Sequence, residues 1–432
     1  MNKAEIIVNA SQILTLEGNN EKPRTKEGMS DLGVLDGKGN AVAIYNGMIV
    51  ATGTEEHGYT VLKELGIRKE QVERIDAEGK LVMPGLIDPH THLVFAGSRE
   101  YELELRMNGA TYLEILAKGG GILSTTRLTR AASEQQLMNE ARPRLDAFLL
   151  HGVTTVEAKS GYGLTVEDEL KQLRVAKRLS NEHPVELIST FMGAHAIPQE
   201  FKENPEAYVD LIINEMLPRV AEEKLAEFCD VFCEHGVFTV EQSERILEAG
   251  KALGLRAKIH ADEIEPMGGA ELAAKVGAIS ADHLLKASDE GIKAMAEAGV
   301  VATLLPGTAF FLMAEFARGR KMVDSGVPVA LSTDRNPGSS PTENLQLIMN
   351  LACFHMKMTP AEVIVATTIN AAHAIGQAKR IGSLEAGKQA DIVFMNVPTY
   401  QYLQYNYGVN HVDTVIKAGH IVVQGGHFVH GK

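Results

Sequence analysis

Apolar runs recur along the middle of the chain, and their alternation with amphipathic stretches constrains the fold most strongly. Each run is short enough for one strand; the eight are Leu81–His92, Val153–Lys159, Val185–His195, Asp230–His235, Leu255–His260, Ile279–Leu285, Val300–Leu305 and Val327–Asp334. Helical spacing marks stretches between them, among them Glu167–Leu179, Thr239–Leu253, Asp289–Ala298 and Glu315–Ser325. Strands that alternate with helices are typical of parallel βαβ units. Eight units in about 300 residues favour an α/β fold, a TIM-like (β/α)8 barrel. The alternative is a doubly wound open sheet, which is disfavoured because no G-x-G-x-x-G motif follows the first run.

Short β-like runs also occupy both ends of the chain. Near the N-terminus they are Ile6–Ala10, Gln12–Leu16 and a hairpin over Ala41–Val50 with Asn46-Gly47 at its turn. Residues 20–40 are polar and Gly-rich, which predicts a loop. Near the C-terminus the runs are Ala390–Met395, Val412–Lys417 and His420–Gln424. We expect a small β-sandwich built from residues 1–80 and 381–432, attached to a barrel of residues 81–380.

Charge and composition narrow the classes of partner. The 432 residues carry a formal net charge of −14 at pH 7, so we expect no nucleic acid and no anionic membrane as partners. Local arginines can still bind a small anionic substrate. The N-terminal residues lack the apolar core of a signal peptide, and no run approaches the roughly 20 apolar residues of a membrane span, which predicts a cytoplasmic protein. Cys229 and Cys233 are four residues apart but have no second cysteine pair, so two buried thiols are favoured over a zinc site.

Histidines and one aspartate end several of the predicted strands. His90 and His92 end the first, His260 ends the fifth and Asp334 ends the eighth. The carboxyl ends of barrel strands lie at one face, where barrel enzymes carry their active sites. A lone histidine there is usually a surface side chain, and Asp334 alone could form a turn. Together, three imidazoles and one carboxylate suit one divalent Zn²⁺ or Fe²⁺, because Mg²⁺ and Ca²⁺ prefer oxygen. We predict these four residues as its ligands, with water completing the shell.

Other polar residues at the same face are candidates for proton transfer. A metal ion with an open position lowers the pKa of bound water to about 7, and the resulting hydroxide attacks a polarised carbon. Asp334 and His283 are candidates to accept the water proton. Glu263, three residues after His260, is placed to carry protons to a substrate nitrogen. The alternative for Glu263 is a solvent-facing loop carboxylate, and the identity of the general base stays open.

These motifs resemble the metal-dependent amidohydrolase superfamily. The carriers include Pro84–His92, His92–Glu100, Gly119–Thr125, Glu157–Gly163, Phe191–Pro198, His260–Glu263, Asn336–Glu343 and Tyr407–His411. The resemblance runs nearly end to end and implies a barrel with a β-sandwich from both termini. It further implies hydrolysis of the ring C–N bond of 4-imidazolone-5-propanoate to N-formimidoyl-L-glutamate, with hydroxide attacking the ring carbonyl. A ring deaminase, which needs no site for a carboxylate tail, and a metal-free scaffold are the alternatives.

The same resemblance implies a set of substrate contacts. They are Arg99, Tyr162, His195, Glu263, Asn336, Gly338 and Ser339. Arg99 suits the carboxylate tail because a guanidinium binds carboxylates in a two-pronged manner; the alternative is a surface ion pair with Glu100 or Glu102. Tyr162, between two glycines, could instead be an exposed loop anchor. The segment after Asp334 offers backbone N–H groups for ligand oxygen atoms.

Three further features complete the expectations. Two-metal amidohydrolases bridge their ions with a carboxylated lysine, but Lys159 ends the second predicted strand, which is the wrong one, so we expect a structural or pocket lysine and a single metal. Arg335 receives no role, and Gly119–Gly121 is expected to be a mobile loop over the site. The base rate among oligomers, together with the family, favours a homodimer.

Overall fold

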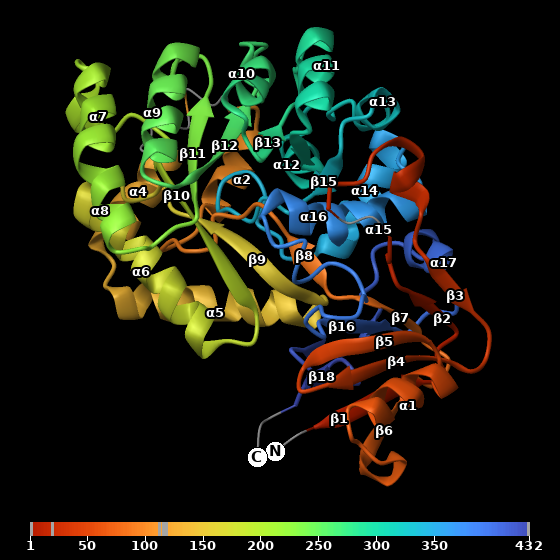
Figure 1. Ribbon diagram of the computed structural model, residues 1–432. Helices are drawn as coiled ribbons and strands as arrows, with labels where there is room; N and C mark the ends of the chain where they lie inside the picture. Colours follow the sequence, from red (N-terminus) through yellow and green to blue (C-terminus); the bar gives the residue numbers. More distant parts are fainter. Residues whose placement is uncertain (1–2, 19–20, 111–113, 115–119, 430–432) are drawn as a thin grey trace.

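Eight parallel strands form the centre of the molecule. The computed structural model describes residues 3–18, 21–110, 114 and 120–429 (Figure 1). The strands pair in chain order: β8 (Leu86–Asp88), β9 (Val153–Lys159), β10 (Glu186–Ala194), β11 (Phe228–Cys233), β12 (Arg256–Ala261), β13 (Ser280–His283), β14 (Val301–Leu304) and β15 (Val329–Leu331). A parallel bridge between Thr91 and Arg335 brings the first and last strands together. The predicted barrel is therefore confirmed.

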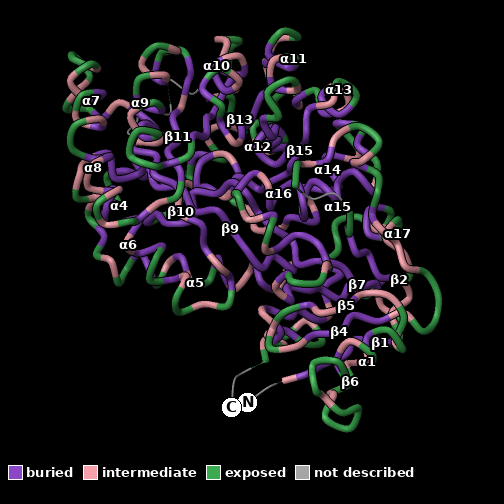
Figure 2. The backbone as a smooth tube through the Cα atoms, in the orientation of Figure 1, coloured by how far each residue is buried: buried purple, intermediate pink, exposed green. Residues whose placement is uncertain are grey.

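Helices cover the strands from outside (Figure 1). In chain order the helices of this part are α2 (Glu100–Met107), α4 (Ile122–Ala131), α5 (Glu134–Leu150), α6 (Val166–Glu182), α7 (Pro205–Leu211), α8 (Leu217–Glu222), α9 (Val240–Ala252), α10 (Gly269–Val276), α11 (Asp289–Ala298), α12 (Pro306–Leu312), α13 (Gly319–Ser325), α14 (Leu345–Met356), α15 (Pro360–Ala366) and α16 (Ile369–Ala374). Short 3-10 and π segments add η3 (Gln199–Phe201) and η4 (Ile212–Met216). Figure 2 shows buried strands inside and exposed residues along the outer helices.

One predicted helix is shorter than expected. The pattern placed it over Glu315–Ser325, but α13 begins at Gly319. Glu315 and Arg318 instead form ion pairs with Lys286 and Asp289 of the preceding unit, both at 2.7 Å. Side-chain pairing between units thus competes with the start of the helix.

Two further sheets form the small domain. One has the order β5-β4-β1-β6 and the other β19-β18-β17-β16-β7-β2-β3, so the second combines both ends of the chain. Their strands are β1 (Ala4–Val8), β2 (Gln12–Leu14), β3 (Val34–Asp36), β4 (Asn40–Tyr45), β5 (Met48–Thr54), β6 (Val72–Asp76), β7 (Leu81–Pro84), β16 (Ile392–Met395), β17 (Val412–Lys417), β18 (His420–Gln424) and β19 (His427–Phe428). Helix α1 (Glu55–Glu64) packs on β4 and β5, and the 3-10 segment η2 (Lys69–Gln71) precedes β6. Helix α17 (Tyr400–Tyr405) and the 3-10 segment η1 (Lys26–Ser30) lie in the terminal segments but pack against barrel helices, α17 on α14 and α15 and η1 on α13 and α15.

An apolar cluster joins the two sheets of the small domain. Ile7 and Val42 from one sheet and Ile13, Val82 and Phe394 from the other belong to it and are buried. At the predicted hairpin turn, Asn46 and Gly47 have φ of 51° and 78°, as a tight turn requires. The predicted domain limits at residues 80 and 380 stay predictions.

Two expectations for these segments are wrong. The run Leu81–His92 is not one barrel strand, because β7 pairs with β16 and β2 and only β8 pairs within the barrel. Gly85 separates the two strands, and its N–H donates to the carbonyl of Asp391 instead of continuing the run. Residues 20–40 are also not all loop, since η1 and β3 lie there; β3 pairs with β2 through Val34 and Leu35, an apolar run of two residues that is too short to predict a strand.

Candidate active site

The four predicted metal ligands converge at the carboxyl ends of three barrel strands. His90 and His92 follow β8, His260 lies in β12 and Asp334 follows β15. The His90 ring lies 4.5 Å from the His260 ring and 5.5 Å from the His92 ring. Asp334 Oδ1 lies 3.4 Å from Nε2 of His90 and 3.7 Å from Nε2 of His92. All four side chains are buried.

Unpartnered buried atoms test whether these residues fit a metal. His90 Nε2, His260 Nε2 and Asp334 Oδ1 have no hydrogen-bond partner among the described residues. Leaving such atoms unpaired in a protein interior costs roughly 1–3 kcal/mol each. Donor atoms of His90, His92 and Asp334 all lie within 4.8 Å of one another, as do those of His90, His260 and His283. This donor set fits a divalent transition metal. It also includes His283, which was predicted only to accept a proton, as a neighbour of His90 and His260.

Two aspartates behind the histidines fix how the rings face. Asp282 Oδ2 lies 2.6 Å from Nδ1 of His90, and Asp230 Oδ1 lies 3.1 Å from Nδ1 of His260. A carboxylate on Nδ1 leaves Nε2 as the metal-binding atom and orients the ring. Sequence reasoning gave neither aspartate a role. Their alternation with outward residues on β11 and β13 was the available signal, because both point into the barrel.

Strained backbone marks the same face. His283 has φ of 74° and Asp334 has φ of 53°, and both are non-glycine residues in the left-handed region. Such conformations cost of order 1–3 kcal/mol and gather at functional sites. The surrounding barrel therefore holds both side chains in orientations that a relaxed strand end would not give.

Glu263 faces the site more than the solvent. Its side chain is 17% exposed, and its Oε2 lies 3.6 Å from Nε2 of His283. Burial, with the charges of Asp334 and Glu234, raises the pKa of Glu263 to about 8. Burial likewise lowers the pKa of His283 to about 4. At neutral pH the pair is therefore a protonated carboxyl beside a neutral imidazole, which is an arrangement suited to proton transfer.

Aromatic rings form one wall beside the histidines. His195 stacks on His92 with ring centroids 4.7 Å apart at 11°, and Tyr162 lies 5.3 Å from His195. Tyr162 is only 3% exposed, so the expectation of an exposed ring is wrong. Gly161 makes this packing possible, since a Cβ on it would lie 2.8 Å from Nδ1 of His195. Flat rings beside a metal centre suit a planar ring substrate.

Arg99 is held by a buried carboxylate. Its Nε and Nη2 donate to the two oxygens of Glu102, both at 2.8 Å. Glu102 also accepts from Arg106 Nη2 at 3.1 Å and from the backbone N–H of Gly121 at 2.8 Å. Burial alone would raise the pKa of Glu102, but the bonds from Arg99 and Gly121 outweigh it and hold that pKa below its usual range. The Arg99–Glu102 pair is therefore present, but it is part of a buried cluster rather than a surface ion pair.

Loop residues after Asp334 pack against this arginine. A Cβ on Gly338 would lie 2.2 Å from Arg99 Nη1, so a larger residue here would force the guanidinium to move. Asn336 Oδ1 accepts from the N–H groups of Gly338 and Ser339 at 2.8 Å, and Asn336 Nδ2 donates to the carbonyl of Asp334 at 2.7 Å. The N–H groups expected to face a ligand are thus used within the loop.

The remaining expectations concern residues away from the histidines or outside the described chain. Cys229 and Cys233 are buried free thiols, as expected. Residues 111–113 and 115–119 lie outside the described residues, and Gly119 of the expected mobile loop is among them.

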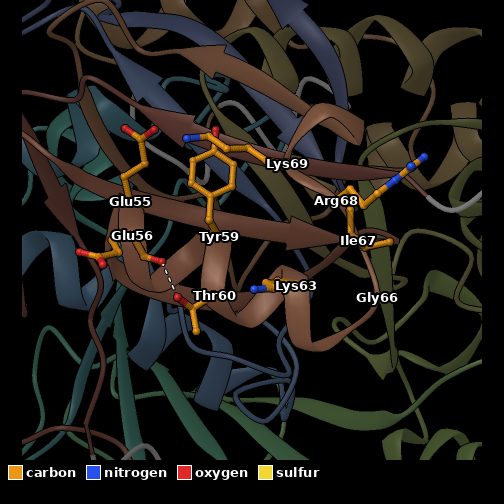
Figure 3. A pocket seen from close by; sticks show the side chains of 9 residues that line it. All are labelled: Glu55, Glu56, Tyr59, Thr60, Lys63, Gly66, Ile67, Arg68 and Lys69. Atoms are coloured by element: carbon orange, nitrogen blue, oxygen red, sulfur yellow. Dashed lines mark hydrogen bonds between the residues drawn. The ribbon is translucent and has the colours of Figure 1, made fainter.

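A cavity of about 680 Å³ lies on the small domain, away from the histidines, and is lined by α1 and the residues up to Lys69 (Figure 3). Its open lining lacks buried polar groups, so we assign it no function. Within the described ranges, no helix is both long and apolar enough to cross a membrane.

Known proteins resemble this chain along nearly its whole length. A family model described as the amidohydrolase family matches residues 81–422. The imidazolonepropionase of Shouchella clausii is 63% identical over 96% of this chain and 92% of its own length. Those of Geobacillus kaustophilus and Brevibacillus brevis are each 61% identical, covering 96% and 99% of this chain and 97% and 99% of their own lengths.

Solved structures with low sequence identity share the fold. A zinc-bound adenosine deaminase from Xanthomonas campestris superposes with a TM-score of 0.70 at 18% identity, covering 99% of this chain and 94% of that one. An atrazine chlorohydrolase from Arthrobacter aurescens complexed with zinc superposes with a TM-score of 0.73 at 17% identity, covering 99% of this chain and 97% of that one. At such identities the likeness concerns the fold alone. The chain belongs to the amidohydrolase family, and within that family it groups with the imidazolonepropionases.

Proposed function

We propose that the protein hydrolyses 4-imidazolone-5-propanoate to N-formimidoyl-L-glutamate with one divalent transition metal, Zn²⁺ or Fe²⁺. His90, His92, His260 and Asp334 would hold the metal. The observation that carries the proposal is that two sets of donor atoms, those of His90, His92 and Asp334 and those of His90, His260 and His283, each lie within 4.8 Å of one another, with Nε2 of His90 and His260 and Oδ1 of Asp334 buried and unpartnered among the described residues. When bound, the metal would polarise the ring carbonyl and lower the pKa of a water molecule to about 7.

The side chains around the metal centre divide the proton transfers. His283 is neutral at pH 7, so its imidazole can accept a proton. Asp334 Oδ2 is engaged by Thr308 Oγ1 at 2.6 Å, which holds that carboxylate in one orientation. Glu263 carries a proton below pH about 8 and can deliver it to the ring nitrogen as the C–N bond breaks. We assign His283 or Asp334 as base and Glu263 as acid.

The substrate contacts follow from charge and shape. We place the propanoate tail at Arg99, because its guanidinium lies beside Gly338 of the loop after Asp334 and a guanidinium binds a carboxylate in a two-pronged manner. We place the planar ring beside Tyr162 and His195, which already stack next to the metal ligands. Asn336, Gly338 and Ser339 would shape the pocket beside Asp334 and Arg99, with Asn336 fixing the loop.

Replacing Arg99 by Met tests the substrate assignment. Removing a two-pronged charged contact costs about 2–3 kcal/mol, so we expect the Michaelis constant for the imidazolone to rise at least about 30-fold. Absorbance of the imidazolone ring would follow the reaction. An unchanged Michaelis constant would show that Arg99 does not bind the propanoate tail, whereas turnover of a ring amine but not of the imidazolone would favour a ring deaminase.

We also propose a homodimer joined through an aromatic patch, defined here as Phe354, Tyr402, Tyr405 and Tyr407. These side chains are 48%, 39%, 81% and 65% exposed, and the rings of Phe354 and Tyr407 lie 5.6 Å apart. Monomers rarely expose contiguous apolar patches. Sedimentation of the wild type and of Y405E/Y407E would test it: a dimer that becomes a monomer supports the interface, and a monomeric wild type contradicts it. The cytoplasmic location and the lack of nucleic-acid and membrane partners stay predictions.

A further inference from the structure

A buried charge cluster lies directly behind the metal-binding histidines. Lys159 Nζ lies 2.6 Å from Asp230 Oδ2, 2.9 Å from Glu157 Oε2 and 3.2 Å from Asp282 Oδ2. Lys258 Nζ lies 3.0 Å from Glu157 Oε1. All five side chains have no exposed surface. An ammonium has three N–H donors, and here three carboxylates surround that of Lys159.

Two of those carboxylates are the ones that orient metal ligands. Asp230 contacts Nδ1 of His260, and Asp282 contacts Nδ1 of His90. Lys159 therefore contacts the supporting carboxylate of each of two imidazoles. One imidazole, His90, follows β8, and the other, His260, lies in β12. A single side chain thus joins the supports of two ligands.

Charge explains why an ammonium stands at this point. Glu157, Asp230 and Asp282 bring three negative charges, and Lys159 and Lys258 bring two positive ones. Without Lys159, three buried carboxylates would share one ammonium that contacts only Glu157 among them. Removal of Lys159 would take away the one ammonium that contacts both Asp230 and Asp282, so their orientation against Nδ1 of His260 and His90 would no longer be fixed.

Lys258 differs from Lys159 in its contacts although it is equally buried. Beyond Glu157, Lys258 Nζ donates to the backbone carbonyls of Pro89 and Ala374 at 3.2 and 3.4 Å. Among the described residues, Lys258 Nζ forms no ion pair with Asp230 or Asp282. The two lysines share charge and burial but differ in their contacts: Lys159 contacts the carboxylates of Asp230 and Asp282, whereas Lys258 contacts the backbone carbonyl that precedes His90.

We propose that Lys159 is a positioning residue for the metal centre, whose ammonium holds Asp230 and Asp282 together and thereby keeps Nε2 of His260 and His90 facing the metal. This inference rests on the proposed metal site. The same ammonium also lies among donor atoms of Asp230, His260 and Asp282, which are within 4.8 Å of one another. It therefore neutralises the carboxylates of Asp230 and Asp282, two of the three donors of this group.

Comparison of K159M with K258M tests the proposal. Loss of one supporting partner of a ligand typically costs 10–100-fold in metal affinity, so K159M, which affects two ligands, should lose about 100-fold or more. Zinc affinity would be measured by chelator competition, and the visible spectrum of the cobalt-loaded protein would report ligand geometry. K258M should keep the wild-type spectrum and an affinity within about threefold, although it also removes a buried charge.

Two results would overturn the inference. One is K159M with wild-type zinc affinity and an unchanged cobalt spectrum. The other is equal losses in K159M and K258M, which would mean a general effect of charge. A wild-type chain that binds no transition metal would overturn the proposed function itself, and with it this inference.

A double-mutant cycle serves if K159M does not fold. D230N and D282N each remove one supporting carboxylate and keep Lys159. Because one ammonium links the two, their losses in zinc affinity should be non-additive by at least about fivefold, which exceeds the usual error of additivity. Additive losses would show that Asp230 and Asp282 act independently and would contradict the role of Lys159.

Discussion

His90 and His260 can bind a metal through Nε2 only if Nδ1 carries the proton. Asp282 and Asp230 accept at Nδ1 and thereby select that tautomer. Arg99 is oriented by a buried partner in the same way, because it donates two hydrogen bonds to the carboxylate of Glu102. Single side chains in this site are thus defined by their buried partners, and predictions at this scale concern those partners.

Glu102 should matter for substrate binding more than for the chemical step. E102Q removes the charge between Arg99 and Arg106, so Arg99 loses its fixed orientation and we expect the Michaelis constant to rise about tenfold with kcat within about threefold. E104Q is the matched control, because Glu104 lies on the same helix but is exposed. Steady-state kinetics on the imidazolone decide the matter. A fall in kcat with an unchanged Michaelis constant would contradict the assignment.

Glu263 should make the metal-free protein less stable as pH rises. Its folded pKa of about 8 exceeds the ordinary 4.5, so between these values the folded state holds a proton that the unfolded state has lost. The free energy of unfolding therefore falls across this window and levels off above it. Melting of chelator-treated protein from pH 5 to 9 should show a smaller fall in E263Q than in the wild type. Parallel curves would show that the pKa of Glu263 is not raised.

Strands and turns decide which residues reach the site, and this is where sequence reasoning was most effective. Parallel strands end at one face, so the motifs at His90, His260 and Asp334 could be brought together before any coordinates existed. The carboxylates that support these ligands could not be assigned in the same way. Asp230 and Asp282 lie within apolar strands, and only the direction of each side chain in the fold reveals its partner. The division of residues 81–92 between two sheets could not be predicted either, because no polar residue separates the apolar residues of β7 from those at the start of β8.

Gly85 should be required where β7 passes into β8. A Cβ at Gly85 would lie 2.5 Å from both Oγ1 and Cγ2 of Thr154, so G85A should reduce the free energy of unfolding by about 1–3 kcal/mol. The double variant G85A/T154A should regain part of the lost free energy of unfolding. Denaturant unfolding of the single and double variants measures both effects. G28A is the control, because a Cβ at Gly28 would meet only ordinary contact at 3.8 Å. An unchanged stability of G85A would mean that the two strands are loosely joined.

At the scale of the whole molecule, a barrel joins ligands that are up to 244 residues apart in the chain, from His90 to Asp334. The small domain borders this barrel through β7, which leads directly into β8 and its histidines. The amidohydrolase barrel explains where the site lies, and the relatives named imidazolonepropionase indicate the reaction. We propose that one metal ion held by His90, His92, His260 and Asp334 makes the site reactive.

Titration of metal into metal-stripped protein tests that claim most directly. Ring opening of 4-imidazolone-5-propanoate would be followed by absorbance while Zn²⁺ or Fe²⁺ is added in measured equivalents, with D334N as the inactive comparison. We expect almost no activity without metal, and an activity that rises with added metal and saturates at one equivalent per chain. Full activity in the stripped protein, or saturation only at two equivalents, would contradict it.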